Sequence, residues 1–168
     1  MEKETLKRAL IAGSFSVLII GSLSYLTYGY EYGLFLVASF GSSMVLMLGY
    51  PETPFARGRN VFTGHLLTSL AGTICHGLLI VQFDIPIYIV IPLAVGLGIF
   101  LMIACNVTHP PAGGNPIIVL VGGYSFEFII TPIITGCLLI IIQAFIINNY
   151  ILKRKYKIWI YIIFAPCI

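Results

Sequence analysis

Thr108-His109-Pro110-Pro111-Ala112-Gly113-Gly114-Asn115-Pro116 is the stretch of sequence that decides the fold. It precedes only eight residues, 117–124, whose composition suits a membrane helix. Eight helical residues cover about 12 Å, less than half of the ~30 Å hydrocarbon core of a bilayer. The rest of this segment must cross as irregular backbone, which is tolerated at that depth only where it is buried in protein or lines a watery cavity. The stretch therefore predicts an interior path or site.

The composition of the whole chain places that site in a membrane protein. Of the 168 residues, 59% are hydrophobic and only 9% are charged, and the mean hydropathy is +1.03. Soluble domains carry about a quarter of their residues as charges, and disordered chains need low hydrophobicity, so both classes are excluded. We predict an all-α membrane protein with six membrane segments, at residues 9–28, 33–49, 61–82, 86–105, 109–124 and 128–150.

The placement of the positive charges predicts the orientation. The nine Lys and Arg residues form three clusters, at 3–8, 57–59 and 153–157. Six crossings with an internal amino terminus put all nine on the cytoplasmic side, as the positive-inside rule requires. We therefore expect one transmembrane domain at 1–150 and a basic and aromatic cytoplasmic tail at 151–168. The first segment is too long for a signal-peptide core and no organellar presequence precedes it, which favours a bacterial inner membrane.

An internal repeat is indicated by a second interrupted segment. Gly41, Ser42 and Ser43 divide the apolar run 33–49, and an offset of 73 residues aligns 41–49 on 114–122. Each interrupted segment is the middle one of a set of three. An odd number of spans reverses the second copy relative to the first, so the pattern predicts a 3+3 inverted repeat, with repeat one at about 9–82 and repeat two at about 86–150.

The two interrupted segments predict half-helices that meet near the midplane. The first is expected to begin at the Gly41–Ser43 break, and the second at Asn115 as a helix cap, with Pro116 at the first helical position. Helix amino termini favour anions, and no acidic residue lies inside any of the six segments. We therefore predict a small anion as the ligand. The predicted substrate-binding residues are Ser42, Ser43, His109, Pro110, Pro111, Gly113, Gly114 and Asn115.

Several of these residues have an architectural interpretation beside the functional one. His109 suits an anion donor or a protonatable gate, and equally a cap for irregular backbone. Pro110 and Pro111 fix the backbone and donate no N–H bond, so their expected role is structural. Gly113 and Gly114 permit close approach either of a ligand or of another helix.

Three motifs in the same order resemble the HPP family of integral membrane proteins. They are Thr108 to Gly113, Phe40 to Ser43, and the stretch 54–67 with Arg59-Asn60 and Gly64-His65-Leu66-Leu67. Members in cyanobacteria and plant plastids are associated with nitrite movement, so the resemblance implies a small-anion transporter with nitrite favoured. Because Arg59 and Asn60 belong to the resemblance, we expect them, with His65, to form a positive vestibule, whereas Arg57 is expected to serve only as a topology signal.

Three classes of function remain open at the level of sequence. A transporter leads, an anion channel of the same architecture is the alternative, and a membrane-embedded redox protein or enzyme comes third. His65 and His76 share one helix face about 16 Å apart, so one metal cannot bind both. We expect no metal, no cofactor and no nucleic acid, with the anion and membrane lipid as partners. The segment 158–168 suits an interfacial anchor or a contact in a homo-oligomer.

Overall fold

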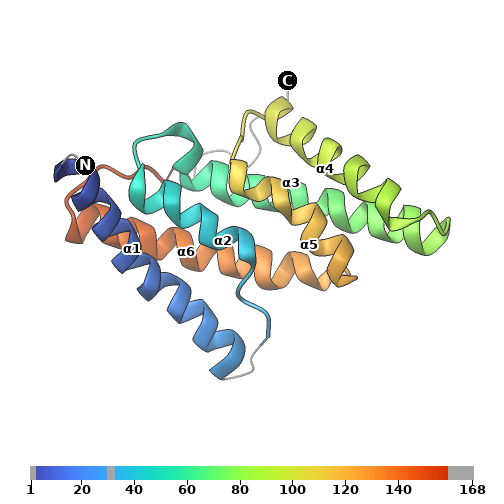
Figure 1. Cartoon of the computed structure of the whole chain (residues 1–168), viewed down its shortest axis with the longest axis horizontal. Coiled ribbons are helices and arrows are strands. Elements are labelled where there is room, and N and C mark those ends of the chain that lie inside the picture. The colour runs from blue at the N-terminus through green and yellow to red at the C-terminus, as the bar shows by residue number, and fades with distance from the viewer. Residues whose placement is uncertain (1–2, 30–32, 159–168) are drawn as a thin grey trace.

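A computed structural model describes residues 3–29 and 33–158, and within those ranges the chain is a bundle of helices without strands (Figure 1). The helices are α1 Lys3–Ser24, α2 Ala38–Met44, α3 Gly58–Cys75, α4 Ile87–Ala104, α5 Asn115–Gly122 and α6 Thr135–Ile146. Wider helical turns extend α1 to Gly29, α2 to Gly49 and α3 to Gln82, and they extend α6 from Ile129 to Ile151.

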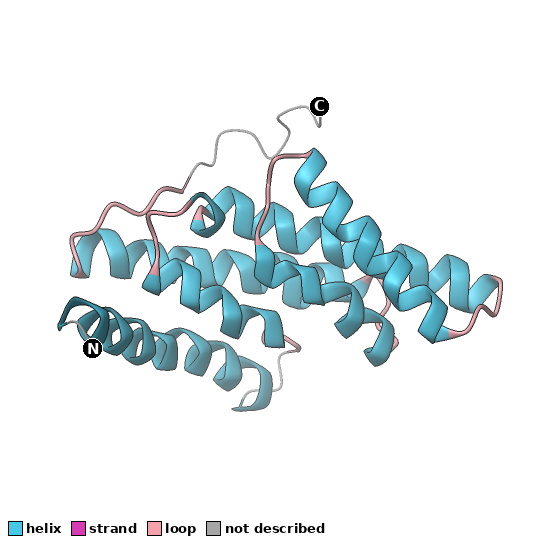
Figure 2. Ribbon diagram, turned by 45° about the horizontal axis from the view of Figure 1, so that its top comes forward, coloured by secondary structure: helices cyan, strands magenta, loops and turns pink. Residues whose placement is uncertain are grey.

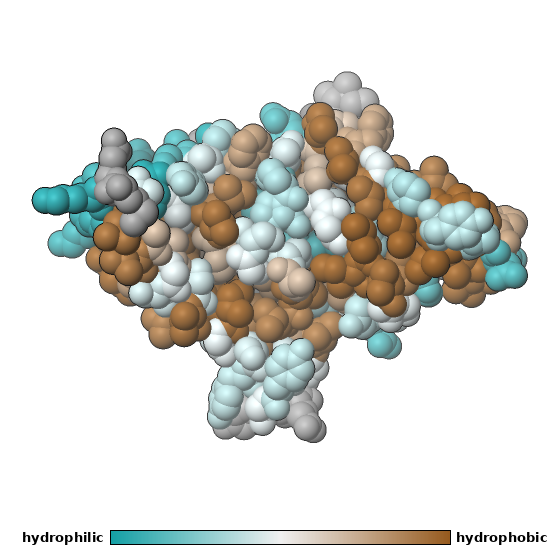
Figure 3. Space-filling view, viewed as in Figure 1, coloured by the Kyte–Doolittle hydropathy of each residue, from teal (hydrophilic) through white to brown (hydrophobic). Residues whose placement is uncertain are grey.

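Four of these helices are long and apolar enough to cross a membrane. They cover Lys3–Gly29, Gly58–Gln82, Ile87–Ala104 and Ile129–Ile151. Large apolar side chains remain exposed on their outer faces, and much of the molecular surface is brown in Figure 3. In a membrane such surface faces lipid, so the predicted class of protein is confirmed. The crossing of segments two and five, and with it the six-span 3+3 repeat, stays a prediction.

The main core lies between α1, α2 and α6. Ile19 of α1, Phe40 and Met44 of α2, and Ile140 and Ala144 of α6 are all buried in one apolar cluster. Figure 2 shows α3 and α6 behind α2 and α5, and α2 contacts residues 110–114, which lead into α5. The core thus holds the two short helices against the long ones.

The predicted break at Gly41–Ser43 is wrong. Residues 33–37 are non-helical, Val37 is extended, and α2 begins at Ala38 and continues through all three residues to Gly49. The physical reason is that the serines find partners without breaking the helix: Ser42 donates to the carbonyl of Ser39 at 3.0 Å, and the Oγ of Ser43 lies 3.0 Å from the same carbonyl. The two serines thus interrupt the apolar pattern without ending the helix.

The helix predicted after the prolines is confirmed, but its predicted cap is not. Pro110–Gly114 forms a 3₁₀ turn that leads directly into α5 at Asn115. The residue at the cap position is Gly114, which is already helical (φ −82°, ψ −14°), and no side chain caps the helix. Because the 3₁₀ turn brings the chain to Asn115 in a helical conformation, the Asn115 side chain is free to bond elsewhere.

The two short helices run in opposite directions. From Ala38, α2 leads to Tyr50, which lies beside Arg8 near the start of α1 (Figure 1). From Asn115, α5 leads away from that end toward Tyr124, which stacks on Phe128 before α6. The part of α2 nearest its start contacts the turn that precedes α5. The two helices therefore diverge from a shared region in the middle of the bundle.

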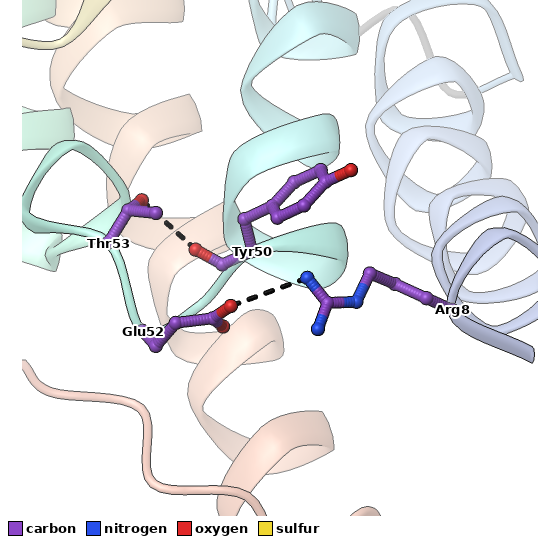
Figure 4. A network of polar contacts seen from close by, with 4 residues as sticks. All are labelled: Arg8, Tyr50, Glu52 and Thr53. Carbon is purple, nitrogen blue, oxygen red and sulfur yellow. Dashed lines mark hydrogen bonds and ion pairs between the residues drawn. The ribbon is translucent and has the colours of Figure 1, made fainter. Parts of the chain in front are cut away.

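The basic clusters gather at one end of the molecule, the basic end. Figure 4 shows the guanidinium of Arg8 pairing with Glu52 at 3.4 Å and covering the ring of Tyr50 at 4.8 Å. The amide of Gly58 donates to the carbonyl of Lys157 at 3.4 Å. The described part of the basic tail, up to residue 158, thus lies against the start of α3. The remaining tail residues, 159–168, lie outside the described residues.

Glycines bring α3, α4 and α5 into close contact. A Cβ on Gly72 of α3 would lie 2.9 Å from the Cα of Pro116 in α5, and one on Gly98 of α4 would lie 3.2 Å from Thr68 of α3. By contrast, an open groove of about 630 Å³ lies beside the contact between α1 and α2, lined by residues including Arg8, Ala12 and Gly41. The close approach of helices at glycines is thus a feature of α3, α4 and α5.

We predict that Gly72→Ala destabilises the protein while Gly77→Ala does not. The added methyl at position 72 meets backbone in α5, and overpacking of this kind costs about 1–3 kcal/mol. A Cβ at position 77 meets nothing within 4 Å, so this variant is a matched control. Thermal unfolding in detergent should show a lowered Tm for Gly72→Ala only. An equal Tm for the two variants would contradict the close contact of α3 with α5.

Candidate functional site

The hydroxyl of Ser43 lies between two imidazole rings. Its Oγ is 3.0 Å from Nε2 of His65 and 2.8 Å from Nε2 of His109, and all three side chains are 0% exposed. The ring centroids of the two histidines are 5.0 Å apart. These contacts join α2, α3 and the residue just before the 3₁₀ turn at one point.

The backbone around His109 fixes where its proton lies. Nδ1 of His109 is 2.7 Å from the carbonyl oxygen of Phe55, which can only accept. The neutral ring therefore carries its proton on Nδ1 and accepts through Nε2. It follows that the Ser43 hydroxyl is the donor to His109.

Asn115 fixes the proton of His65 in the same way. Its amide nitrogen lies 3.0 Å from Nδ1 of His65, 3.3 Å from the His65 carbonyl and 2.9 Å from Oγ of Ser69. Because an amide N–H donates, Nδ1 of His65 accepts, and the neutral ring carries its proton on Nε2. A directed chain of hydrogen bonds therefore runs from Asn115 through His65 and Ser43 to His109.

Local sequence explains how these side chains are brought together. His65 and Ser69 are four residues apart and lie on one face of α3. Phe40, one turn before Ser43, packs edge-on against His65 with ring centroids 5.1 Å apart. Gly64 leaves room for His109, because a Cβ on Gly64 would lie 2.9 Å from that of His109. We call the set Ser43, His65, Ser69, His109 and Asn115 the polar cluster.

Not all of the predicted binding residues join the polar cluster. Ser43, His109 and Asn115 do, whereas Ser42 is exposed and bonds only the preceding turn. Pro110 and Pro111 form the 3₁₀ turn beside the cluster. Gly113 and Gly114 border open space, since a Cβ on either would meet nothing within 4 Å. The glycines thus leave room next to the cluster without being part of it.

The three residues predicted to form the vestibule also lie in two different places. Arg59 donates to the carbonyl of Cys105 at 3.4 Å, and Asn60 donates to that of Thr108 at 3.0 Å. Both residues therefore hold the connection between α4 and His109. His65, predicted beside them, is fully buried in the polar cluster, because α3 enters the bundle before reaching it.

Sequence reasoning missed two members of this arrangement. Ser69 follows His65 by one helical turn, and that spacing was the available signal. No feature of the sequence indicates the carbonyl of Phe55, because any backbone carbonyl in the loop could serve as the acceptor for His109.

The chemistry of the cluster is that of neutral donors in an apolar setting. Hydroxyl, imidazole and amide N–H groups are present, and none of the described residues in contact with them is acidic. Among the described residues no group of three or more metal-ligating side chains is found. The arrangement is thus able to donate hydrogen bonds to a small negatively charged ligand once the buried side chains separate.

Comparison with known proteins gives a family match over most of the chain. The model of the HPP transmembrane region matches residues 1–157. A transmembrane protein of Dictyostelium discoideum is 34% identical over 128 residues, which are 74% of this chain and 45% of the relative. Another from the same organism is 31% identical over 147 residues, or 85% and 47%. The chain thus spans about half the length of these relatives. No solved structure matches it.

We predict that Ser43→Ala destabilises the protein more than Ser42→Ala. Loss of the Ser43 hydroxyl leaves the facing nitrogens of both histidines buried without a partner, at a cost of about 1–3 kcal/mol. The Ser42 hydroxyl is exposed and bonds only its own helix. Thermal unfolding of the two variants in the same detergent measures the difference. A Tm that is unchanged by Ser43→Ala would show that the two histidines do not depend on this contact.

Proposed function

Because this chain belongs to the HPP family of integral membrane proteins, we propose that it carries a small inorganic anion across the membrane, with nitrite as the first substrate to test. The observation that supports this proposal is the polar cluster, a set of neutral hydrogen-bond donors buried where the two short helices diverge. Buried ionisable groups in a membrane protein are functional candidates by default.

The charge distribution favours an anion over a cation. The acidic residues of the chain all lie outside the six apolar segments. Near the cluster, α5 begins at Asn115, and the amino terminus of a helix carries a partial positive charge. A cation there would meet donors and a positive helix end, whereas an anion would be stabilised by both.

The path that we propose follows the two short helices. In this proposal the basic end is cytoplasmic, both termini lie there, and the chain crosses six times as two inverted sets of three in a bacterial inner membrane. The opposite directions of α2 and α5 support this arrangement. The point from which they diverge then lies near the midplane, as in other transporters with broken helices.

The burial of the cluster supports a carrier rather than an open channel. Ser43, His65 and His109 are each 0% exposed, so an anion reaches them only after the surrounding helices move. A carrier needs such an occluded arrangement, because its site opens to one side at a time. The experiment is the flux of nitrite, nitrate, formate and chloride into proteoliposomes that contain the purified chain, compared with empty liposomes.

We predict that Gly114→Leu abolishes this flux and that Gly96→Leu does not. Both glycines border open space, so both variants should fold. The leucine at position 114 fills the space beside the start of α5, whereas the one at 96 lies on the exposed face of α4. Flux is measured after equal insertion of the two variants has been confirmed. Normal anion flux through the Gly114→Leu variant would contradict the proposal that the path passes beside the start of α5.

We predict that residues 57 and 155 are labelled from the same membrane face and residue 84 from the other. The expectation follows from the gathering of the basic clusters at one end. Single cysteines at these positions, in a background without other cysteines, are treated with an impermeant thiol reagent in intact cells and in inverted vesicles. Labelling of 57 and 155 from opposite faces would contradict the six-span arrangement and the inverted repeat.

A further inference from the structure

We infer that the polar cluster takes up one proton with each anion, on His109, so that the chain is an electroneutral anion–proton symporter. The inference rests on the proposed anion transport and adds its coupling ion. It is carried by the hydrogen-bond geometry of Ser43, which allows His109 to accept a second proton while the N–H and O–H groups of Ser43 and both histidines all keep an acceptor.

The first step concerns charge. An isolated anion in an apolar site is costly unless a positive charge accompanies it. The cationic side chains of the chain cluster at the basic end, and the guanidinium of Arg59 is directed to the carbonyl of Cys105. Within the polar cluster only the two histidines can become positive. A proton on one of them would therefore add a full positive charge to the neutral donors and the helix end that face the anion.

The second step concerns Ser43, whose single hydroxyl proton has two acceptors. Its Oγ lies 2.8 Å from Nε2 of His109 and 3.0 Å from the carbonyl of Ser39. When Nε2 of His109 gains a proton, the bond between the two side chains reverses, and the imidazolium donates to Oγ. The Ser43 hydroxyl then turns to the Ser39 carbonyl, and every proton still has an acceptor.

The third step distinguishes the two histidines. A second proton on His65 would lie on Nδ1, which faces the amide nitrogen of Asn115 at 3.0 Å. Two N–H donors would then face each other without an acceptor. Rotating that amide would keep the contact with Ser69, whose hydroxyl can donate, but would set the amide oxygen against the carbonyl oxygen of His65. His109 therefore accepts the proton. The ring centroids of the two histidines are 5.0 Å apart, so a positive charge on one ring disfavours protonation of the other. The cluster therefore holds only one extra proton at a time.

Other charged groups near His109 do not replace it in this role. His65 faces it from α3, and α2 contributes only the hydroxyl of Ser43. The loop that supplies the Phe55 carbonyl also carries Arg57 and Glu52, and Glu52 pairs with Arg8. On the connection from α4, the carbonyl of Cys105 accepts from Arg59.

The balance of each cycle is one proton and one anion. Both enter from one side, the proton rests on Nε2 of His109 as the anion accepts hydrogen bonds from the cluster, and both leave on the other side. No net charge crosses. At equilibrium an inside-alkaline gradient of one pH unit should therefore accumulate the anion about tenfold inside, whatever the membrane potential.

The experiment uses proteoliposomes with the full chain, with nitrite and nitrate as probes. Nitrate is the decisive probe if it is transported, because its acid does not leak through lipid. A trapped pH dye and an anion assay record the proton flux and the anion flux, and potassium with valinomycin sets the membrane potential.

We expect equal proton and anion entry, unchanged by an imposed membrane potential. Anion entry without protons, or accumulation set by the potential, would overturn symport and leave anion transport standing. No flux of any anion would overturn the proposed function.

Two histidine variants locate the proton. His109→Asn should abolish coupled accumulation, leaving at most an anion flux that follows the potential. His76→Asn is the matched control, because His76 lies on the extension of α3 outside the cluster, and its proton-to-anion ratio should stay at one. A ratio of one in His109→Asn would overturn the assignment to His109. Should that variant fail to fold, the ratio measured in the unmodified protein still decides the coupling.

Discussion

The need to pair the hydroxyl of Ser43 governs the centre of the molecule. A polar group buried in an apolar bundle must find a partner, and Ser43 finds Nε2 of two histidines from two other segments. Each histidine is in turn held through Nδ1, by the Phe55 carbonyl or by Asn115. A short helix, a long helix, a 3₁₀ turn and a loop are therefore fixed by one connected set of hydrogen bonds, and changing any member affects all four.

Much of the fold follows from composition and spacing alone. The membrane class, the apolar segments and the short helix after Pro110-Pro111 could be predicted because length and hydropathy constrain them strongly. The α5 helix ends at Gly122, two residues before the predicted end of its segment. The meeting of Ser43, His109 and Asn115 could also be anticipated, since the two interrupted segments that hold them were predicted to form half-helices that meet near the midplane.

The features that the sequence predicts incorrectly share one physical cause. Their positions depend on contacts between distant segments, which the sequence does not reveal. Ser42 and Ser43 interrupt the apolar run, but Ser42 bonds the preceding turn, Ser43 bonds the two histidines, and the helix continues. Asn115 has the residue type of a cap, yet its amide bonds α3. His65 was expected in the vestibule with Arg59 and Asn60. The sequence does not show how far α3 enters the bundle before it reaches His65, because that distance depends on tertiary packing.

The close packing at two glycines has a consequence for motion. At Gly72 and Gly98 the helices α3, α4 and α5 lie so close together that no added side-chain atom fits between them, so we expect these three helices to move as one body. On the other side of the molecule an open groove lies between α1 and α2. Ser43 of α2 and His65 of α3 face each other at the contact between α2 and the three closely packed helices. A displacement of α2 relative to α3 would therefore act first on the few hydrogen bonds that hold the centre closed.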